Sequence, residues 1–167
     1  LVRSLRCRPP SRQKAQARTA ETYPLPMQAR AQAVLALHAS NAEEQGEALA
    51  HMQGLQSRLS KADKASLEAI FARQLWRLDG QNFTRMYGHI NSTNAASFPY
   101  TIINLEQGRR LLASSNPEQK STGQQILQSL VSSGVLANPP LAESLLQAAT
   151  AQESALQINP ENIQSKG

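Results

Sequence analysis

The chain has 167 residues, which is enough for one domain whose core needs neither disulfides nor a metal. Aromatic residues make up only 4% of it and charged residues 17%, while Ala, Leu, Gln and Ser are abundant, so the composition favours packed helices over a β-sandwich. The single cysteine, Cys7, excludes an internal disulfide and a paired-cysteine zinc site, and no apolar run approaches the roughly 20 residues of a membrane span.

The formal net charge of +5 is concentrated at the N-terminus. Residues 1–20 contain no acidic residue, whereas all 12 acidic residues come after them, against 11 of the 17 basic ones. The rest of the chain is therefore close to neutral. The basic residues of this N-terminal arm are Arg3, Arg6, Arg8, Arg12, Lys14 and Arg18.

Residues 1–26 are predicted to form an extended or disordered basic arm, because a Pro9-Pro10 pair and few apolar residues leave it nothing to bury. Three interpretations stay open. The arm contacts the phosphates of RNA or another polyanion, it is an Arg-rich organellar (mitochondrial) targeting segment, or it is a solvated tail without a role. No secretory signal peptide is visible, so the compartment is undetermined, with an intracellular location favoured.

The folded domain is predicted over residues 27–158, directly after Tyr23-Pro24-Leu25-Pro26. Two prolines at this boundary favour an extended turn and then the start of a helix. A first helix is expected from Met27 to near Ser40. Its apolar residues are Met27, Val34, Leu35 and Leu37.

A second helix is predicted to begin at Asn41, whose side chain can accept a hydrogen bond from a free amide of the first turn. Leu49, Met52, Leu55 and Leu59 then recur at helical spacing. Gly46 and Gly54 weaken the segment and would allow another helix to approach closely.

The strongest helical pattern runs from the capping Ser60 to Asp79-Gly80, where the glycine is expected to end the helix. Its two apolar faces are separated by charged residues such as Glu68. The face with large residues carries Leu67, Ile70, Phe71, Leu75 and Leu78. The opposite Ala/Trp face carries Ala65, Ala69, Ala72 and Trp76, and it packs either on another helix of this chain or on another protein.

Residues 81–100 are expected to form a short helix followed by a loop over residues 91–99. The candidate polar site lies here, in the form of Asp79, Arg85, Tyr87 and His89 with two neighbouring glycines. An acid, a cation, a phenol and an imidazole together can bind an anion or assist proton transfer. The alternative is an ordinary polar segment whose aromatic residues fill the bundle.

Asn-Pro pairs mark predicted boundaries between helices in the last third of the chain. A helix over residues 104–113 is predicted to be followed by one from Asn116-Pro117 to Gly134, and another is predicted to start at Asn138-Pro139. Asn159-Pro160 is expected to begin a short C-terminal tail over residues 159–167. The predicted fold is an all-α bundle of about five to seven helices.

The sequence contains neither HExxH, HxxxH nor paired cysteines, and neither a P-loop nor a GxGxxG segment, so no metal, cofactor or nucleotide is expected. A non-enzymatic helical interaction subunit that docks on a larger protein assembly ranks first, because the double-faced helix suits docking. A ribonucleoprotein component that contacts RNA or phosphate through residues 1–20 ranks second. A small enzyme or anion-binding protein acting at residues 79–89 ranks third.

Overall fold

A computed structural model describes the backbone of residues 22–166 and the side chains of residues 22–156. This part of the chain forms seven α-helices and one 3₁₀ segment, and it contains no strand, which confirms the all-α prediction. The elements are α3 (Leu25–His38), α4 (Ala42–Leu55), η1 (Gln56–Arg58), α5 (Lys61–Trp76), α6 (Gly80–Tyr87), α7 (Tyr100–Leu112), α8 (Pro117–Ser133) and α9 (Pro140–Lys166).

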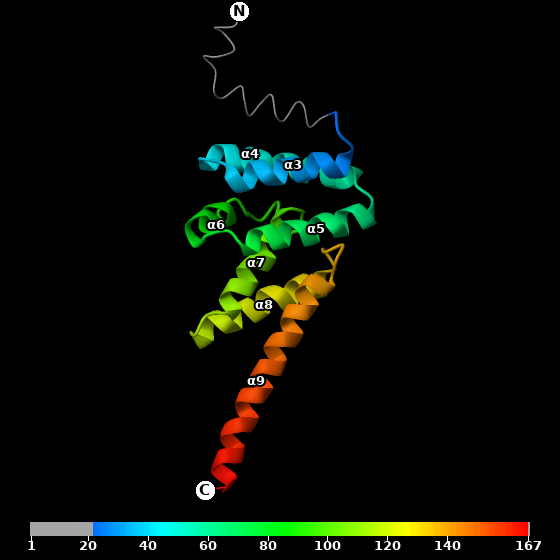
Figure 1. Cartoon of the computed structure of the whole chain (residues 1–167). Coiled ribbons are helices and arrows are strands. Elements are labelled where there is room, and N and C mark those ends of the chain that lie inside the picture. Colours follow the sequence, from blue (N-terminus) through cyan, green and yellow to red (C-terminus); the bar gives the residue numbers. More distant parts are fainter. Residues whose placement is uncertain (1–21, 167) are drawn as a thin grey trace, which may run out of the picture.

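The helices are stacked in levels along the molecule (Figure 1). Helices α3 and α4 lie side by side at one end, and α5 and α6 form the next level. From there α7 leads to α8, on which it packs closely. The first turns of α9 pack on α8 and α7, and the rest of α9 extends away from the stack.

Three of the helices begin where the sequence predicts, each with a capping hydrogen bond between residues two or three positions apart. The side chains of Asn41, Ser60 and Asn116 accept from backbone N–H groups of the first turn of α4, α5 and α8, at 2.8, 3.1 and 2.9 Å. Gly134 ends α8 with a left-handed φ of 67°, also as predicted.

The predicted end of the third helix is wrong. Helix α5 ends at Trp76, and Gly80 is the first residue of α6 rather than the terminator of α5. The reason is Asp79, whose Oδ2 accepts from the backbone N–H of Asn82 at 3.2 Å and so caps α6. An aspartate before a glycine starts a helix here because the free amides that follow it need an acceptor.

Two other helix boundaries differ from the prediction. Helix α7 begins at Tyr100, and its early residues Ile102 and Ile103 are fully buried, so packing extends the helix N-terminally. Helix α9 continues through Asn159-Pro160, where the sequence predicts a separate tail. A proline removes only one backbone donor, and helical residues flank this one on both sides.

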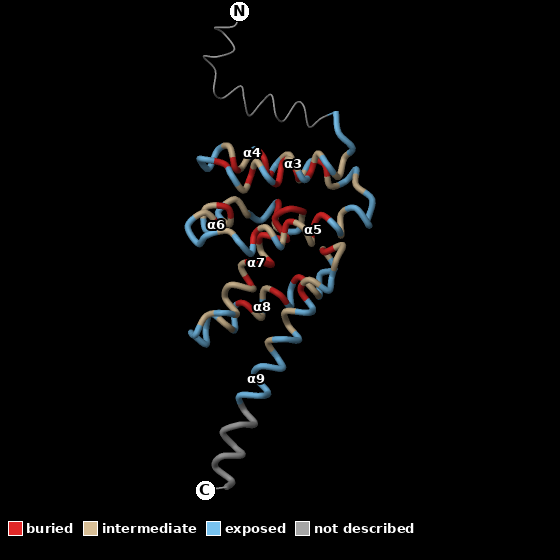
Figure 2. Tube along the Cα trace, viewed as in Figure 1, coloured by how far each residue is buried: buried red, intermediate tan, exposed pale blue. Residues whose placement is uncertain are grey.

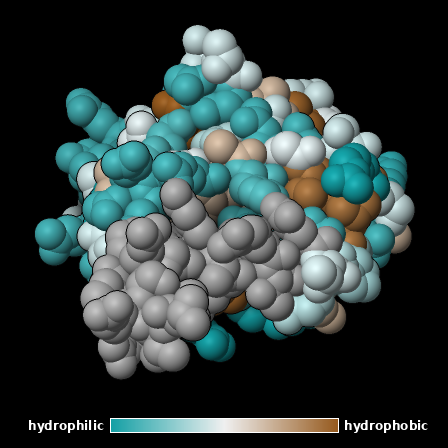
Figure 3. Space-filling view, turned by 90° about the horizontal axis from the view of Figure 1, so that it is seen from above, coloured by the Kyte–Doolittle hydropathy of each residue, from teal (hydrophilic) through white to brown (hydrophobic). Residues whose placement is uncertain are grey.

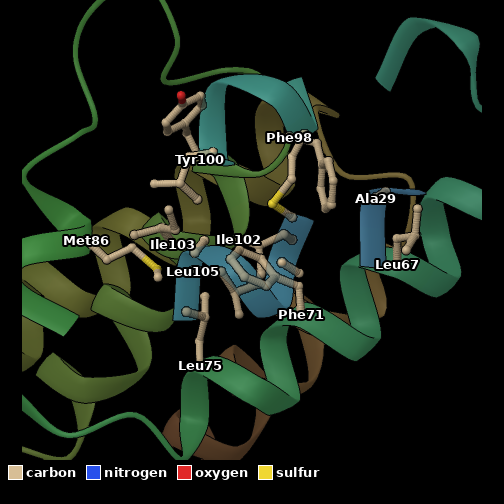
Figure 4. Close-up of a cluster of buried hydrophobic side chains, with 14 of the residues drawn as sticks. Ala29, Leu67, Phe71, Leu75, Met86, Phe98, Tyr100, Ile102, Ile103 and Leu105 are labelled. Carbon is tan, nitrogen blue, oxygen red and sulfur yellow. The ribbon is translucent and has the colours of Figure 1, made fainter. Parts of the chain in front are cut away.

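Phe71 lies at the centre of the hydrophobic core (Figure 4). Its ring meets the ring of Phe98 edge to face, with 6.3 Å between centroids. Buried segments are concentrated between the levels of the stack, whereas residues 151–156 of α9 are exposed (Figure 2). The other buried residues labelled around Phe71 are Ala29, Leu67, Leu75, Met86, Tyr100, Ile102, Ile103 and Leu105.

Apart from Gln32, the residues that α3 buries are alanines. Ala29, Ala33 and Ala36 are buried, and α3 packs on both α4 and α5. The larger Met27 and Val34, which mark the helix in the sequence, are about half exposed. Alanine side chains let two helix backbones approach closely. Burying the alanine face of α3 therefore allows closer packing against α4 and α5 than burying the face with Met27 and Val34 would.

Helices α7 and α8 cross at two glycines. A Cβ atom on Gly123 would lie 2.7 Å from the carbonyl oxygen of Gly108, and one on Gly108 would meet the Leu127 side chain at 3.1 Å. This close approach requires glycine, most strictly at residue 123, because the nearest neighbour there is backbone and cannot move aside.

Candidate functional site

The residues of the predicted polar site lie at both ends of α6. Asp79 caps the start of the helix and is exposed, and hydrogen bonds from Asn82 hold the pKa of Asp79 below its usual value. Arg85 and His89 lie at and beyond the other end of α6. The structure therefore brings Arg85 and His89 together and leaves Asp79 apart from them.

Arg85 holds α6 against the end of α3. Its guanidinium donates to the carbonyl oxygens of Ala39 and Ser40, at 2.8 and 3.3 Å. These carbonyls follow the last turn of α3, where no further turn of the helix supplies donors. The Arg85 guanidinium thus supplies the donors that these two carbonyl groups need.

His89 packs its ring on Gly46 of α4, where a Cβ atom would meet ring atoms at 3.1–3.2 Å. Its Nε2 lies 3.3 Å from Oε1 of Gln45, and Gln45 in turn donates to the carbonyl of Ala36 at 3.2 Å. Burial lowers the pKa of His89, and the nearby positive charge of Arg85 lowers it further. Gly46 thus makes room for a histidine ring rather than for the backbone of another helix, and Gly54 faces open space, so neither glycine serves the close helix contact that the sequence predicts.

The aromatic ring of Tyr87 packs within α6. It lies against Phe83, with 6.2 Å between ring centroids. Tyr87 is also partly buried against the hydrophobic core, while Arg85 and His89 bind residues of α3 and α4 or just beyond them. A structural role therefore explains this segment among the described residues. A site for an anion or for proton transfer at residues 79–89 stays a prediction.

The Ala/Trp face of α5 forms one wall of a cavity of about 420 Å³ between α5, α7 and α9. We call this cavity the Trp76 groove. Its alanines face the neighbouring helices, but Trp76 itself is 60% exposed at the rim. Its lining residues are Ala69, Ala72, Arg73, Trp76, Leu105, Glu106, Arg109, Asn138, Pro140, Leu141, Ser144 and Leu145.

Buried charges hold the rim of the groove in place. The Arg109 guanidinium lies over the Trp76 ring, 4.6 Å from its centroid, and also donates to the Glu106 carboxylate at 2.7 and 2.8 Å. Glu106 is 1% exposed and accepts a further bond from Arg110 at 2.7 Å. The negative charge of Glu106 is thus shared between two arginines.

Arg110 connects this cluster to the end of α5. It donates to the carbonyls of Leu75 and Leu78, at 3.0 and 2.6 Å, and its guanidinium lies 4.3 Å from the centroid of the Phe83 ring. The sequence presents Arg109 and Arg110 only as a pair too small for a basic stripe. The signal that could have found their role is Glu106 at spacings of three and four residues on the same helix.

Glu68 of α5 holds the residues that precede α9, the helix that forms the opposite wall of the groove. Although the sequence suggests a flanking position, it is fully buried and accepts from the backbone N–H groups of Ala137 and Asn138, at 3.0 and 2.7 Å. Asn138 also donates to the carbonyl of Ala65 at 3.3 Å. Burial raises the pKa of Glu68 even though these two backbone bonds act to lower it.

A second cavity, of about 710 Å³, lies on the other side of α5 between α3, α5 and the start of α6. Val34, Leu37 and Ile70 contribute its apolar lining, and Arg73 lines both cavities. Across the face seen from above, the surface is mostly hydrophilic, and a hydrophobic patch gathers at one side (Figure 3). Among described residues, the exposed large hydrophobic side chains are Tyr23, Met27, Val34, Trp76 and Leu156.

The remaining predicted features lie elsewhere. The six basic residues of the arm, Arg3, Arg6, Arg8, Arg12, Lys14 and Arg18, lie outside the described residues. Within the described part, no helix is long and apolar enough to cross a membrane, and no group of acidic, His or Cys side chains is arranged to hold a metal ion. No protein-family model, curated protein or solved structure matches the chain.

Proposed function

We propose that this chain is a non-enzymatic helical interaction subunit that docks on a larger protein assembly through the Trp76 groove. The observation that supports this function is Trp76, a large aromatic side chain that is 60% exposed beside an apolar cavity of about 420 Å³. Exposed apolar groups at a concave surface are typical of binding sites, and Trp is enriched among the residues that contribute most to binding energy.

Contacts within the chain hold the side chains around the groove. Arg109 is held by Glu106 and in turn covers the Trp76 ring, while Glu68 anchors the residues that precede α9. Side chains that are already held lose little freedom on binding, which favours affinity. The buried charges around the groove therefore support a docking role as well as the fold.

The experiment that tests this function places the photo-cross-linking amino acid p-benzoylphenylalanine at residue 76 of the full chain in its native cells. Because residue 76 is exposed at the groove, illumination is expected to give one defined cross-linked protein, identified by mass spectrometry. The matched control carries the same amino acid at Leu156, which is also 60% exposed but lies on the projecting part of α9.

A cross-link that forms at residue 76 and not at residue 156 supports the function. The proposal is overturned if residue 76 gives no cross-linked protein, or if both positions capture the same mixture of abundant proteins. The second outcome would show random collision at exposed sites rather than docking.

The charge distribution favours a second candidate, an RNA-contacting subunit. Residues 1–20 carry six basic residues and no acid. If all six contact phosphates, the logarithm of the binding constant should fall with the logarithm of salt concentration with a slope of about −4 for single-stranded RNA and about −5 for a duplex. Filter binding at several salt concentrations, with the full chain and a chain lacking residues 1–20, measures this slope. A slope unchanged by the deletion would contradict the candidate.

A further inference from the structure

The exposed charge beside Trp76 is positive. Arg73 and Arg77 are exposed on α5, one turn before Trp76 and directly after it. Glu106, the carboxylate in the groove lining, is buried and already paired with two arginines. Arg73 lines the groove itself, and Arg77 lines the neighbouring cavity between α3, α5 and α6. A ligand that enters the groove along α5 would therefore meet these exposed cations beside apolar side chains.

A cavity lies on each side of Arg73. Arg73 lines the Trp76 groove on one side of α5 and the α3/α5/α6 cavity on the other. In the second cavity the carboxylate is that of Asp79, which accepts from Asn82 at 2.6 and 3.2 Å. A segment bound along α5 could thus place apolar side chains in a cavity while its charges stay at the arginines.

The walls of the groove are helices, and the described residues contain no strand edge. An extended peptide would find no row of backbone groups to pair with, whereas a helix satisfies its own backbone and needs only an apolar face and complementary charges. Nucleic acid is less suited to this surface, because an apolar cavity with two exposed arginines offers few phosphate contacts.

We propose that the occupant of the Trp76 groove is an acidic amphipathic helix of a partner protein. Its apolar face enters the groove beside Trp76, and its carboxylates pair with Arg73 and Arg77. This inference rests on the proposed docking function and names the chemistry of the partner segment.

Trp76 is the only tryptophan of the chain, so its fluorescence reports on the groove alone. The probe is a synthetic helical peptide of about 18 residues, five turns, with Leu on one face, Glu on the other and no Trp. A matched peptide carries Lys in place of every Glu. Titration of the full chain with the Glu peptide is expected to shift the Trp76 emission to a saturating value, at a concentration at least tenfold lower than the Lys peptide requires.

Charge variants of the protein locate the contact. The double change Arg73→Glu and Arg77→Glu should weaken binding of the Glu peptide roughly tenfold or more, because two attractive pairs become repulsive. The milder pair Arg73→Gln and Arg77→Gln should give a smaller loss. Arg58→Glu, at an exposed arginine of η1, should leave binding unchanged. Circular dichroism checks that each variant keeps its helices.

The inference is overturned if the Glu peptide leaves the Trp76 emission unchanged, if the Lys peptide or a single-stranded RNA binds as tightly, or if the Arg73/Arg77 changes have no effect. These outcomes concern only the charge and class of the occupant. A defined protein cross-linked at residue 76 would still support the docking function, whereas absence of that cross-link would remove the function itself.

Discussion

At the scale of single residues, the polar side chains that matter most are those with partners far along the chain. Glu68 is bonded to the backbone of Asn138, Arg85 to that of Ala39, and Arg110 to that of Leu75. Each satisfies backbone groups or charges that would otherwise be buried without a partner, which is costly. Trp76 differs from them, since its side chain is exposed and its ring lies against the Arg109 guanidinium.

Trp76→Ala is expected to cost about 1 kcal/mol or less in the free energy of unfolding, because the change removes one exposed cation–π contact and little buried area. The neighbouring Leu75→Ala should cost about 2–5 kcal/mol, because Leu75 is fully buried. Urea unfolding of the two variants measures both values. Equal losses would place Trp76 in the core and contradict its role as an exposed contact.

His89 should make the protein less stable as the solution becomes acidic. Its pKa in the folded chain lies below the usual 6.5, so as the pH falls through 6.5 the unfolded chain binds a proton before the folded chain does. The stability contributed by neutral His89 is complete above that pH and is lost below it. Urea unfolding between pH 5 and 7.5 should show a smaller decline in stability for His89→Gln than for the unchanged chain. Equal declines in the two proteins would contradict the prediction.

At the scale of elements, the starts of helices were more predictable than their ends and faces. Asn41, Ser60 and Asn116 cap their helices through bonds to residues two or three positions away, which sequence reasoning can recognise. The Ala-lined face of α3 and the early start of α7 depend instead on which helices they meet. The start of α9 depends on both, because Asn138-Pro139 is a local signal, whereas Glu68 of α5 accepts from the two backbone N–H groups just before the helix.

Glu68→Ala should loosen α9. The change leaves the backbone N–H groups of Ala137 and Asn138 without their acceptor, at a cost of about 2 kcal/mol or more in the free energy of unfolding. Faster hydrogen exchange at these two amides should accompany the loss. Glu47→Ala, at an exposed glutamate of α4, should stay within about 0.5 kcal/mol. An equal effect of the two changes would show that Glu68 does not anchor α9.

At the scale of the whole molecule, one core joins the levels of the stack. Phe71 of α5 meets Phe98 before α7, and buried residues of α3, α6 and α7 surround this pair (Figure 4). The Trp76 groove lies between helices of the same stack, so docking surface and core share α5 and α7. The protein should therefore unfold as a unit.

Thermal unfolding followed by circular dichroism and by Trp76 fluorescence is expected to give coincident transitions, because helix content and the groove depend on one core. Phe71→Ala should lower the free energy of unfolding by about 3–5 kcal/mol and move both transitions together. A fluorescence transition well below the helix transition would show that α7 and α9 separate from α5 independently.

By itself, the sequence determined the helical class, most helix starts, the glycine that ends α8, the concentration of positive charge before residue 21 and the Ala/Trp face as a candidate contact. These features depend on composition or on interactions within about one helical turn. Only the tertiary structure decided that Glu68 and Glu106 are buried, that Arg85 and His89 join helices, and that Trp76 stands exposed at a cavity. The physical reason is that burial and long-range hydrogen bonds are properties of which helices meet, and their partners lie up to 73 residues apart in the chain.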